Sequence, residues 1–116
     1  MTMNPNSHTT PQTPQEVCLQ LRHFNQVIGR QCRNMQNQGF ACPCCLTDIV
    51  IGCDAGIKLC VQQLTQPRPQ TPIFQQLRNA LVDLRAEAKG VHRMDVMVRA
   101  SNDISWLLRE LYFETF

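Results

Sequence analysis

Apolar side chains recur at helical spacing in several long stretches of this chain, and short segments rich in proline, glycine or asparagine separate those stretches. In an α-helix, residues three and four positions apart share one face, so this spacing indicates helices with one apolar side. The pattern therefore predicts an all-α fold of about four amphipathic helices.

The first predicted helix begins at a capping box. Thr13 supplies a capping hydroxyl, Pro14 fits the first helical position, and Glu16 can return to the amide of the cap. The apolar repeat carries this helix to about Met35. Residues 1–12 are rich in Asn, Thr, Pro and Gln with almost no large apolar side chains, so we expect a disordered arm there.

The second and third helices are separated by a proline-stiffened linker at 65–72. The second is predicted from about Thr47 to Leu64. Gly52 and Gly56 lie one turn apart within it, and their low helix propensity makes sense where another helix approaches closely. The third is predicted from Pro72 to about Lys89.

Residues 91–99 fit either a strand or a helix, because their apolar side chains match both spacings. A final helix is predicted from Asn102 to about Tyr112, with Ser101 as its cap. The expected organisation is a single helical domain over residues 13–116, divided into a helix–knuckle–helix half at 13–64 and C-terminal helices at 73–116.

Three of the seven cysteines, Cys42, Cys44 and Cys45, fall within four positions between the first and second predicted helices. The Cys42-x2-Cys45 spacing lets one turn of backbone present two thiolates to a zinc ion. Since a helix rises about 1.5 Å per residue, each flanking helix offers one further cysteine to the same ion. The predicted zinc ligands are Cys32, Cys42, Cys45 and Cys53, with Cys44 or His92 as alternates for the fourth.

Two other interpretations of the cysteines stay open. Free cysteine is commonly a small buried hydrophobe, and this is our preferred interpretation of Cys18 and Cys60, which lie on or beside apolar stripes. A C-x-x-C pair can also be a dithiol exchange site, although the helices predicted on both sides are not the usual context of an oxidoreductase. No arrangement of catalytic residues is evident, so we predict a protein that is not an enzyme.

Two rows of basic residues follow single sides of the first and third predicted helices, an arrangement that can track a phosphate backbone. The formal net charge of +2 does not by itself indicate a nucleic-acid-binding protein. The candidate nucleic-acid-binding residues are Arg22, Arg30, Arg33, Arg78, Arg85 and Lys89.

With its small size, its central Phe40-Ala41-Cys42-Pro43-Cys44-Cys45 segment and its basic helical faces, the chain resembles the small cysteine-rich accessory proteins encoded by plant RNA viruses. The resemblance covers residues 32–60 and the general layout. It implies a zinc-binding protein that suppresses host RNA silencing and has RNA as a partner. A host protein is the alternative partner that we expect. The chain departs from that pattern because it has no dense basic run near the cysteines.

The chain shows neither a secretory signal at its start nor a stretch of roughly 20 apolar residues. With an odd number of cysteines, this predicts an intracellular protein, cytoplasmic with the nucleus as a second compartment, and without a membrane partner. Charged residues make up only 17% of the chain, so its surfaces repel one another weakly, and we favour a homodimer. The main alternative is a metal-free helical interaction module whose cysteines belong to the core.

Overall fold

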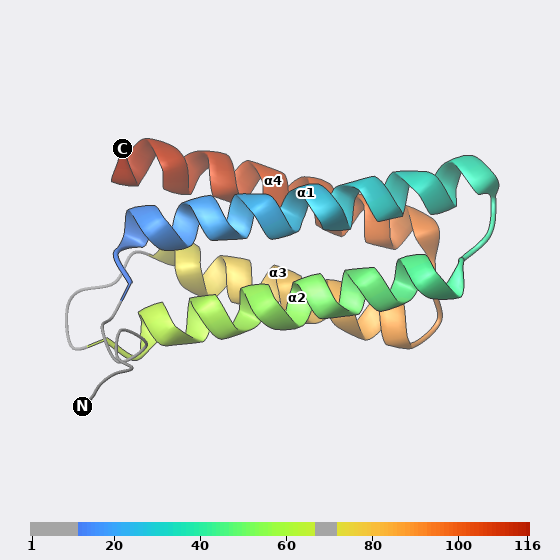
Figure 1. The fold of residues 1–116 in the computed structure, drawn as a ribbon, viewed down its shortest axis with the longest axis horizontal. Helices are drawn as coiled ribbons and strands as arrows, with labels where there is room; N and C mark the ends of the chain where they lie inside the picture. The colour runs from blue at the N-terminus through green and yellow to red at the C-terminus, as the bar shows by residue number, and fades with distance from the viewer. Residues whose placement is uncertain (1–11, 67–71) are drawn as a thin grey trace, which may run out of the picture.

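The computed structural model describes residues 12–66 and 72–116, and within them the fold is an up-and-down bundle of four α-helices (Figure 1). The prediction of an all-α fold with about four helices is confirmed. The helices are α1 (Pro14–Gln38), α2 (Pro43–Leu64), α3 (Pro72–Lys89) and α4 (Met94–Thr115).

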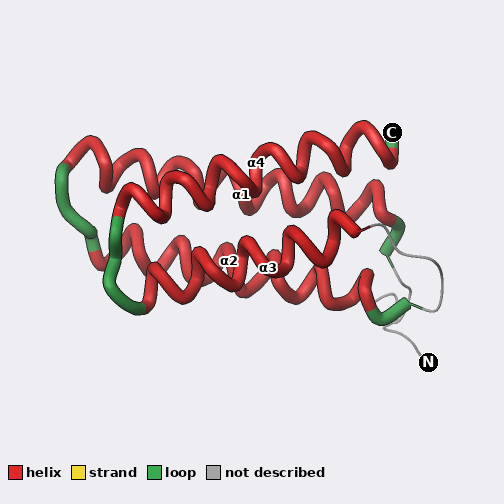
Figure 2. The backbone as a smooth tube through the Cα atoms, turned by 180° about the vertical axis from the view of Figure 1, so that it is seen from behind, coloured by secondary structure: helices red, strands yellow, loops and turns green. Residues whose placement is uncertain are grey.

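The helices form two layers, with α1 and α4 in one and α2 and α3 in the other (Figures 1 and 2). Both α1 and α3 pack against α2 and α4, so α1 and α3 lie diagonally across the bundle. Short connections place consecutive helices antiparallel. The α1–α2 and α3–α4 connections consequently lie at the same end of the molecule, and the C-terminus lies at the other (Figure 1).

Helix α1 begins at the predicted capping box. The hydroxyl of Thr13 accepts a hydrogen bond from the Glu16 amide at 3.2 Å, and the Glu16 carboxylate accepts one from the Thr13 amide at 2.8 Å. The helix continues three residues beyond the predicted end, to Gln38. It stops at Gly39, whose left-handed φ of 81° lets its amide donate to the Met35 carbonyl at 2.9 Å.

Helix α2 begins at Pro43, four residues before the predicted start. Proline suits the first helical position because it lacks an amide proton and its φ is already helical. Cys44 and Cys45 therefore lie in the first turn of α2 rather than in a separate knuckle, and Cys42 occupies the N-cap position.

Helix α4 begins at Met94, eight residues before the predicted start, so most of the ambiguous segment 91–99 is helical. The predicted cap, Ser101, is instead a buried residue inside this helix, and the N-cap position belongs to Arg93. The apolar spacing of the segment fits the inner face that α4 presents to the bundle, formed by Met97, Ser101, Ile104, Leu108 and Leu111.

The four helices share one hydrophobic core. The close approach predicted at the glycines of α2 is confirmed: a Cβ atom at Gly52 would lie 2.9 Å from Ile28 of α1, and one at Gly56 would lie 2.9 Å from Leu81 of α3. Among the core residues are the cysteines predicted as buried hydrophobes, Cys18 and Cys60, both 0% exposed.

The predicted arm and linker lie largely outside the described residues, which exclude 1–11 and 67–71. Gln12, placed at the end of the arm by the prediction, has a partner in the bundle: its carbonyl accepts a hydrogen bond from the Gln63 side chain at 2.8 Å. Within the described part of the chain, no helix is both long enough and apolar enough to cross a membrane.

Candidate metal centre

Three thiols come together where α2 begins. The Sγ atoms of Cys42, Cys44 and Cys45 all lie within 4.8 Å of one another, and those of Cys42 and Cys44 are 2.9 Å apart. Bonds of about 2.3 Å to a tetrahedral zinc ion set sulfur atoms about 3.8 Å apart, a value that lies between the shortest contact and the upper limit of the distances in this cluster. The three cysteines could therefore hold a metal ion.

The thiol cluster, by which we mean Cys42, Cys44 and Cys45, lies at the boundary between the core and the solvent. Cys45 is only 6% exposed and belongs to the core, Cys42 is half-buried, and Cys44 is exposed. One thiol is thus anchored by packing while another is accessible. An ion held there would be open to a ligand from another molecule.

The Cys42 thiol is the most acidic of the cluster. A hydrogen bond from the Cys44 thiol, together with the backbone amides of Cys45 and Cys44, lowers the pKa of Cys42 to about 7. Those amides belong to the first turn of α2, where unpaired N–H groups and the helix dipole favour negative charge. The Cys42 side chain is therefore partly ionised to the thiolate at neutral pH.

The pKa values of the other two thiols are raised rather than lowered. Donation of its hydrogen bond to Cys42, and the negative charge of that thiolate, raise the pKa of Cys44. Burial, with the hydrogen bond to Cys42 second in importance, raises the pKa of Cys45 to about 11. Near neutrality the cluster therefore holds one partly ionised thiol, Cys42, and two protonated thiols, so it must lose between two and three protons to present three thiolates.

The structure does not bring the predicted ligands Cys32 and Cys53 into this cluster. Both are buried in the core, and the Cys32 thiol is directed at the carbonyl of Met97 in α4, at 3.9 Å. Burial raises the pKa of Cys32 to about 11 and that of Cys53 to about 12. Cys44, an alternate ligand in the sequence prediction, is the residue that completes the trio.

His92, the other alternate, lies in the α3–α4 connection at the same end of the bundle as the thiol cluster (Figures 1 and 2). Within the described residues, the His92 side chain does not join the thiol cluster. Its backbone has a left-handed φ of 65°, and its amide donates to the Glu87 carbonyl at 3.1 Å. His92 thus acts in the turn through its backbone.

An ion pair next to His92 was missed by the sequence analysis. Glu87 is 8% exposed, and its carboxylate accepts hydrogen bonds from the Arg93 amide at 2.9 Å and from the Arg93 guanidinium at 2.8 and 3.1 Å. These bonds lower the pKa of Glu87 to about 2. The available signal was the position of Glu87 on the apolar side of its helix, three residues after Leu84.

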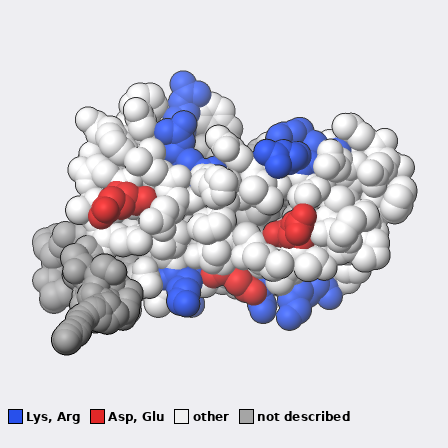
Figure 3. All heavy atoms as spheres, viewed as in Figure 1, with Lys and Arg blue, Asp and Glu red and all other residues white. Residues whose placement is uncertain are grey.

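The six predicted nucleic-acid-binding residues do not form one surface. Three belong to α1 and three to α3, which lie diagonally across the bundle. Arg85 of α3 is paired with Asp54 of α2, and Arg22 of α1 lies over the Tyr112 ring, with Cζ 5.0 Å from its centroid. Figure 3 shows basic side chains in separate groups near the edges of the visible face, with acidic side chains between them.

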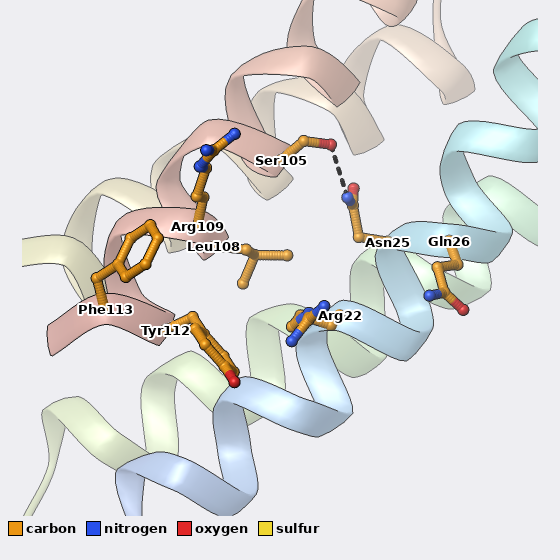
Figure 4. Close-up of a pocket in the computed structure, with 8 residues that line it drawn as sticks. All are labelled: Arg22, Asn25, Gln26, Ser105, Leu108, Arg109, Tyr112 and Phe113. Carbon is orange, nitrogen blue, oxygen red and sulfur yellow. Dashed lines mark hydrogen bonds between the residues drawn. The ribbon is translucent and has the colours of Figure 1, made fainter. Parts of the chain in front are cut away.

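A groove between α1 and α4 was also missed by the sequence analysis. It has a volume of about 460 Å³, and Arg22 of α1 and Arg109, Tyr112 and Phe113 of α4 are among its lining residues (Figure 4). Asn25 bridges the two helices there by donating to the Ser105 hydroxyl at 2.8 Å. The signal for this surface was the aromatic content of the last eleven residues.

Comparisons with protein families, with curated proteins and with solved structures found no significant match to this chain.

Proposed function

We propose that this protein is a non-enzymatic, zinc-binding accessory protein whose metal site is the thiol cluster. The observation that carries this proposal is the proximity of three sulfur atoms, within 4.8 Å of one another, at an accessible helix start. Thiolate is a preferred ligand of zinc, and three protein ligands are the number found where zinc keeps an open fourth position.

Cys42 supplies the first thiolate, because its pKa of about 7 leaves it partly ionised at neutral pH. Cys44 and Cys45 lose their protons as the metal binds, since a metal stabilises the thiolate over the thiol. Cys45 is fixed in the core by its burial, so the position of the site is set by the packing of α2.

The accessible side of the cluster suits an accessory role. Cys44 is exposed, so the fourth ligand can come from solvent or from a side chain of another protein. A fourth ligand from another protein would make the affinity for that protein depend on metal loading.

The biological role that we attach to this site is suppression of host RNA silencing, as the resemblance to plant-virus proteins implies. We place the partner among host proteins rather than RNA, because the candidate basic residues are divided between two diagonal helices. A leaf reporter assay tests this role: Cys44→Ser should abolish suppression, whereas Arg30→Glu should leave it intact.

Metal analysis tests the zinc site directly. Protein purified without chelator should contain one zinc per chain, and cobalt substitution should give thiolate-to-metal absorption. Cys44→Ser should remove both signals. Cys60→Ala is the matched control, because it removes a core cysteine and leaves the cluster intact. Absence of stoichiometric zinc, with a melting temperature unaffected by chelator, would refute the proposal.

Proton release gives a second readout of the same site. At pH 7 the Cys42 thiol is partly ionised, while Cys44 and Cys45 are protonated, so binding through all three should release between two and three protons per zinc. Calorimetry in buffers of different ionisation enthalpy measures this number. A value below one would exclude three-thiolate ligation.

A dithiol exchange function is the second candidate. The sequence pattern assigns it to Cys42 and Cys45, whereas the 2.9 Å contact between the Cys42 and Cys44 sulfurs favours Cys42 and Cys44 as the pair. In this reaction the Cys42 thiolate attacks a substrate disulfide, and Cys44 then displaces the reduced substrate as the Cys42–Cys44 disulfide forms. Cys45→Ser separates the two functions. It should spare disulfide turnover in an oxidoreductase but abolish stoichiometric metal binding in a zinc protein.

A further inference from the structure

The outward side of α4 carries an aromatic ridge, defined here as Trp106 and Phe113. The two side chains are 65% and 70% exposed, respectively. They are seven residues apart, which is about two helical turns or 10.5 Å along the axis, so they project on the same side. That side is opposite the face that carries the buried Ile104, Leu108 and Leu111.

A charged pair lies between the two rings along the ridge. The guanidinium carbon of Arg109 is 5.6 Å from the centroid of the Trp106 ring and 5.9 Å from that of Phe113. Glu110, the next residue, is exposed. Neither charge belongs to an ion pair within the described residues. Exposed aromatic rings around an arginine have the composition of an interface hot spot.

We propose that the aromatic ridge is the interface of a homodimer in which α4 packs antiparallel against α4 of a second copy. The ridge is self-complementary, because it contains both signs of charge between two apolar groups. In a two-fold interface, when one residue of the first copy contacts a second residue of the other copy, the same contact also occurs with the two copies exchanged.

The two-fold axis passes between Arg109 and Glu110. This register places Trp106 against Phe113 of the second copy, and Arg109 against Glu110 of the second copy. Both pairs occur twice because of the symmetry. All four exposed rings are then covered, and each guanidinium gains a carboxylate partner.

Charge decides between the antiparallel and the parallel arrangement. In a parallel pair, with the two-fold axis along the helices, Arg109 would lie near Arg109 of the second copy, and Glu110 near Glu110 of the second copy. Like charges at close range oppose association, whereas the antiparallel register pairs opposite charges.

This interface is independent of the proposed zinc site. Helix α4 begins at the end of the bundle that carries the thiol cluster, and Trp106 and Phe113 lie in its second half, toward the other end (Figure 1). Figure 4 shows Arg109 and Phe113 projecting from α4 beside the groove. The dimer should therefore form equally well in Cys44→Ser and in the presence of chelator, so its failure and that of the zinc site are separable.

The chain contains a single tryptophan, so the intrinsic fluorescence of Trp106 reports directly on the interface. As the protein concentration rises, we expect the emission to shift to shorter wavelength while sedimentation equilibrium shows the mass doubling. The two transitions should coincide. A monomer at every concentration up to the millimolar range would overturn the proposal.

Phe113→Ser should weaken dimerisation at least about tenfold, because it removes an aromatic anchor that is expected to dominate the contact. Phe40→Ser is the matched control: Phe40 is 57% exposed but lies in the α1–α2 connection, and its substitution should leave the dissociation constant unchanged. Circular dichroism confirms that both variants fold. Equal weakening in both would overturn the assignment of the interface.

Charge exchange tests the antiparallel register. Arg109→Glu should weaken dimerisation roughly fivefold, by placing two carboxylates opposite each other, and the double variant Arg109→Glu/Glu110→Arg should restore it. A double variant as weak as Arg109→Glu would overturn this register. Trp106 emission that responds to single-stranded RNA in a persistently monomeric protein would assign the ridge to nucleic acid and overturn the dimer.

Discussion

The α1–α2 and α3–α4 connections lie at the same end of the bundle, and each joins two antiparallel helices in a few residues (Figure 1). In the α3–α4 connection, the Glu87 carboxylate is satisfied by Arg93, and the Glu87 carbonyl accepts from Gly90 and His92. In the α1–α2 connection, three thiols gather, and the Cys42 sulfur contacts that of Cys44 at 2.9 Å.

This difference shows how one bundle end combines stability with reactivity. In the α3–α4 connection, both the carboxylate and the carbonyl of Glu87 are paired within the chain, and these contacts fix the turn. The thiols of the α1–α2 connection interact mainly with one another, and they remain available for a metal or an oxidant. The α3–α4 connection therefore stabilises the end of the bundle at which the thiols of the α1–α2 connection can react.

Thiol alkylation should show the largest contrast. At pH 7, iodoacetamide should modify Cys42 at least about a hundredfold faster than the core cysteines, because its pKa is about 7 and its side chain is accessible. Peptide mass spectrometry with time gives each rate. Comparable rates at Cys42 and Cys60 would contradict the environments described for them. The cysteines expected to be protected until the protein unfolds are Cys18, Cys32, Cys53 and Cys60.

Loss of the Glu87 carboxylate should have the largest effect on stability. Glu87→Gln removes the charge that satisfies Arg93 at two guanidinium nitrogens and its amide, so the melting temperature should fall clearly. Asp54→Asn is the matched control, since it breaks a surface ion pair with Arg85 and should cost only about 0.5 kcal/mol. Equal losses in the two variants would show that the α3–α4 turn is not held by this contact.

Acid should weaken the same turn. The pKa of Glu87 is lowered to about 2 in the folded protein, from an ordinary value near 4.5, so its contribution to stability is present above about pH 4.5. It is lost as the pH falls toward 2, because the carboxylate becomes protonated. Denaturant titrations between pH 6 and pH 2 should therefore show a smaller decline in Glu87→Gln than in the unaltered protein.

The smallest expected effects concern the left-handed residue in each connection. Gly39 has a φ of 81° and His92 a φ of 65°. Gly39→Ala should destabilise the protein by about 1 kcal/mol, because a side chain disfavours this conformation. His92→Gly should change stability by less than that, and in the stabilising direction. Chemical denaturation measures both, and a destabilised His92→Gly would mean that the imidazole itself supports the turn.

Much of the fold was predictable from local signals. The capping box at Thr13 located the start of α1 to the residue, and Gly52 and Gly56 indicated the close helix contacts in the core. The start of α4 was not predictable in this way. Residues 94–98 fit both a strand and a helix, and the structure places Met97 and Ser101 against α1, where tertiary packing favours the helix.

The candidate site was predictable where its members are close in sequence. Cys42 and Cys45 were identified by their spacing, and Cys44 was retained as an alternate. Cys32 and Cys53 could not be placed in the same way, because their distance from the cluster depends on where each side chain points within a packed core. The α1–α4 groove depends on which helices become neighbours, which helical periodicity does not specify.

The sulfur of Cys42 stands where most helices place an oxygen, at the N-cap of α2. Alkylation, oxidation or metal ligation at this atom changes the charge presented to the first amides of the helix. The fraying of α2 should consequently follow the chemical state of one side chain. Hydrogen-exchange rates at the amides of Cys44, Cys45 and Leu46 would then report whether the Cys42 sulfur is free, modified or bound to metal. The exchange rates in the rest of the bundle provide the reference.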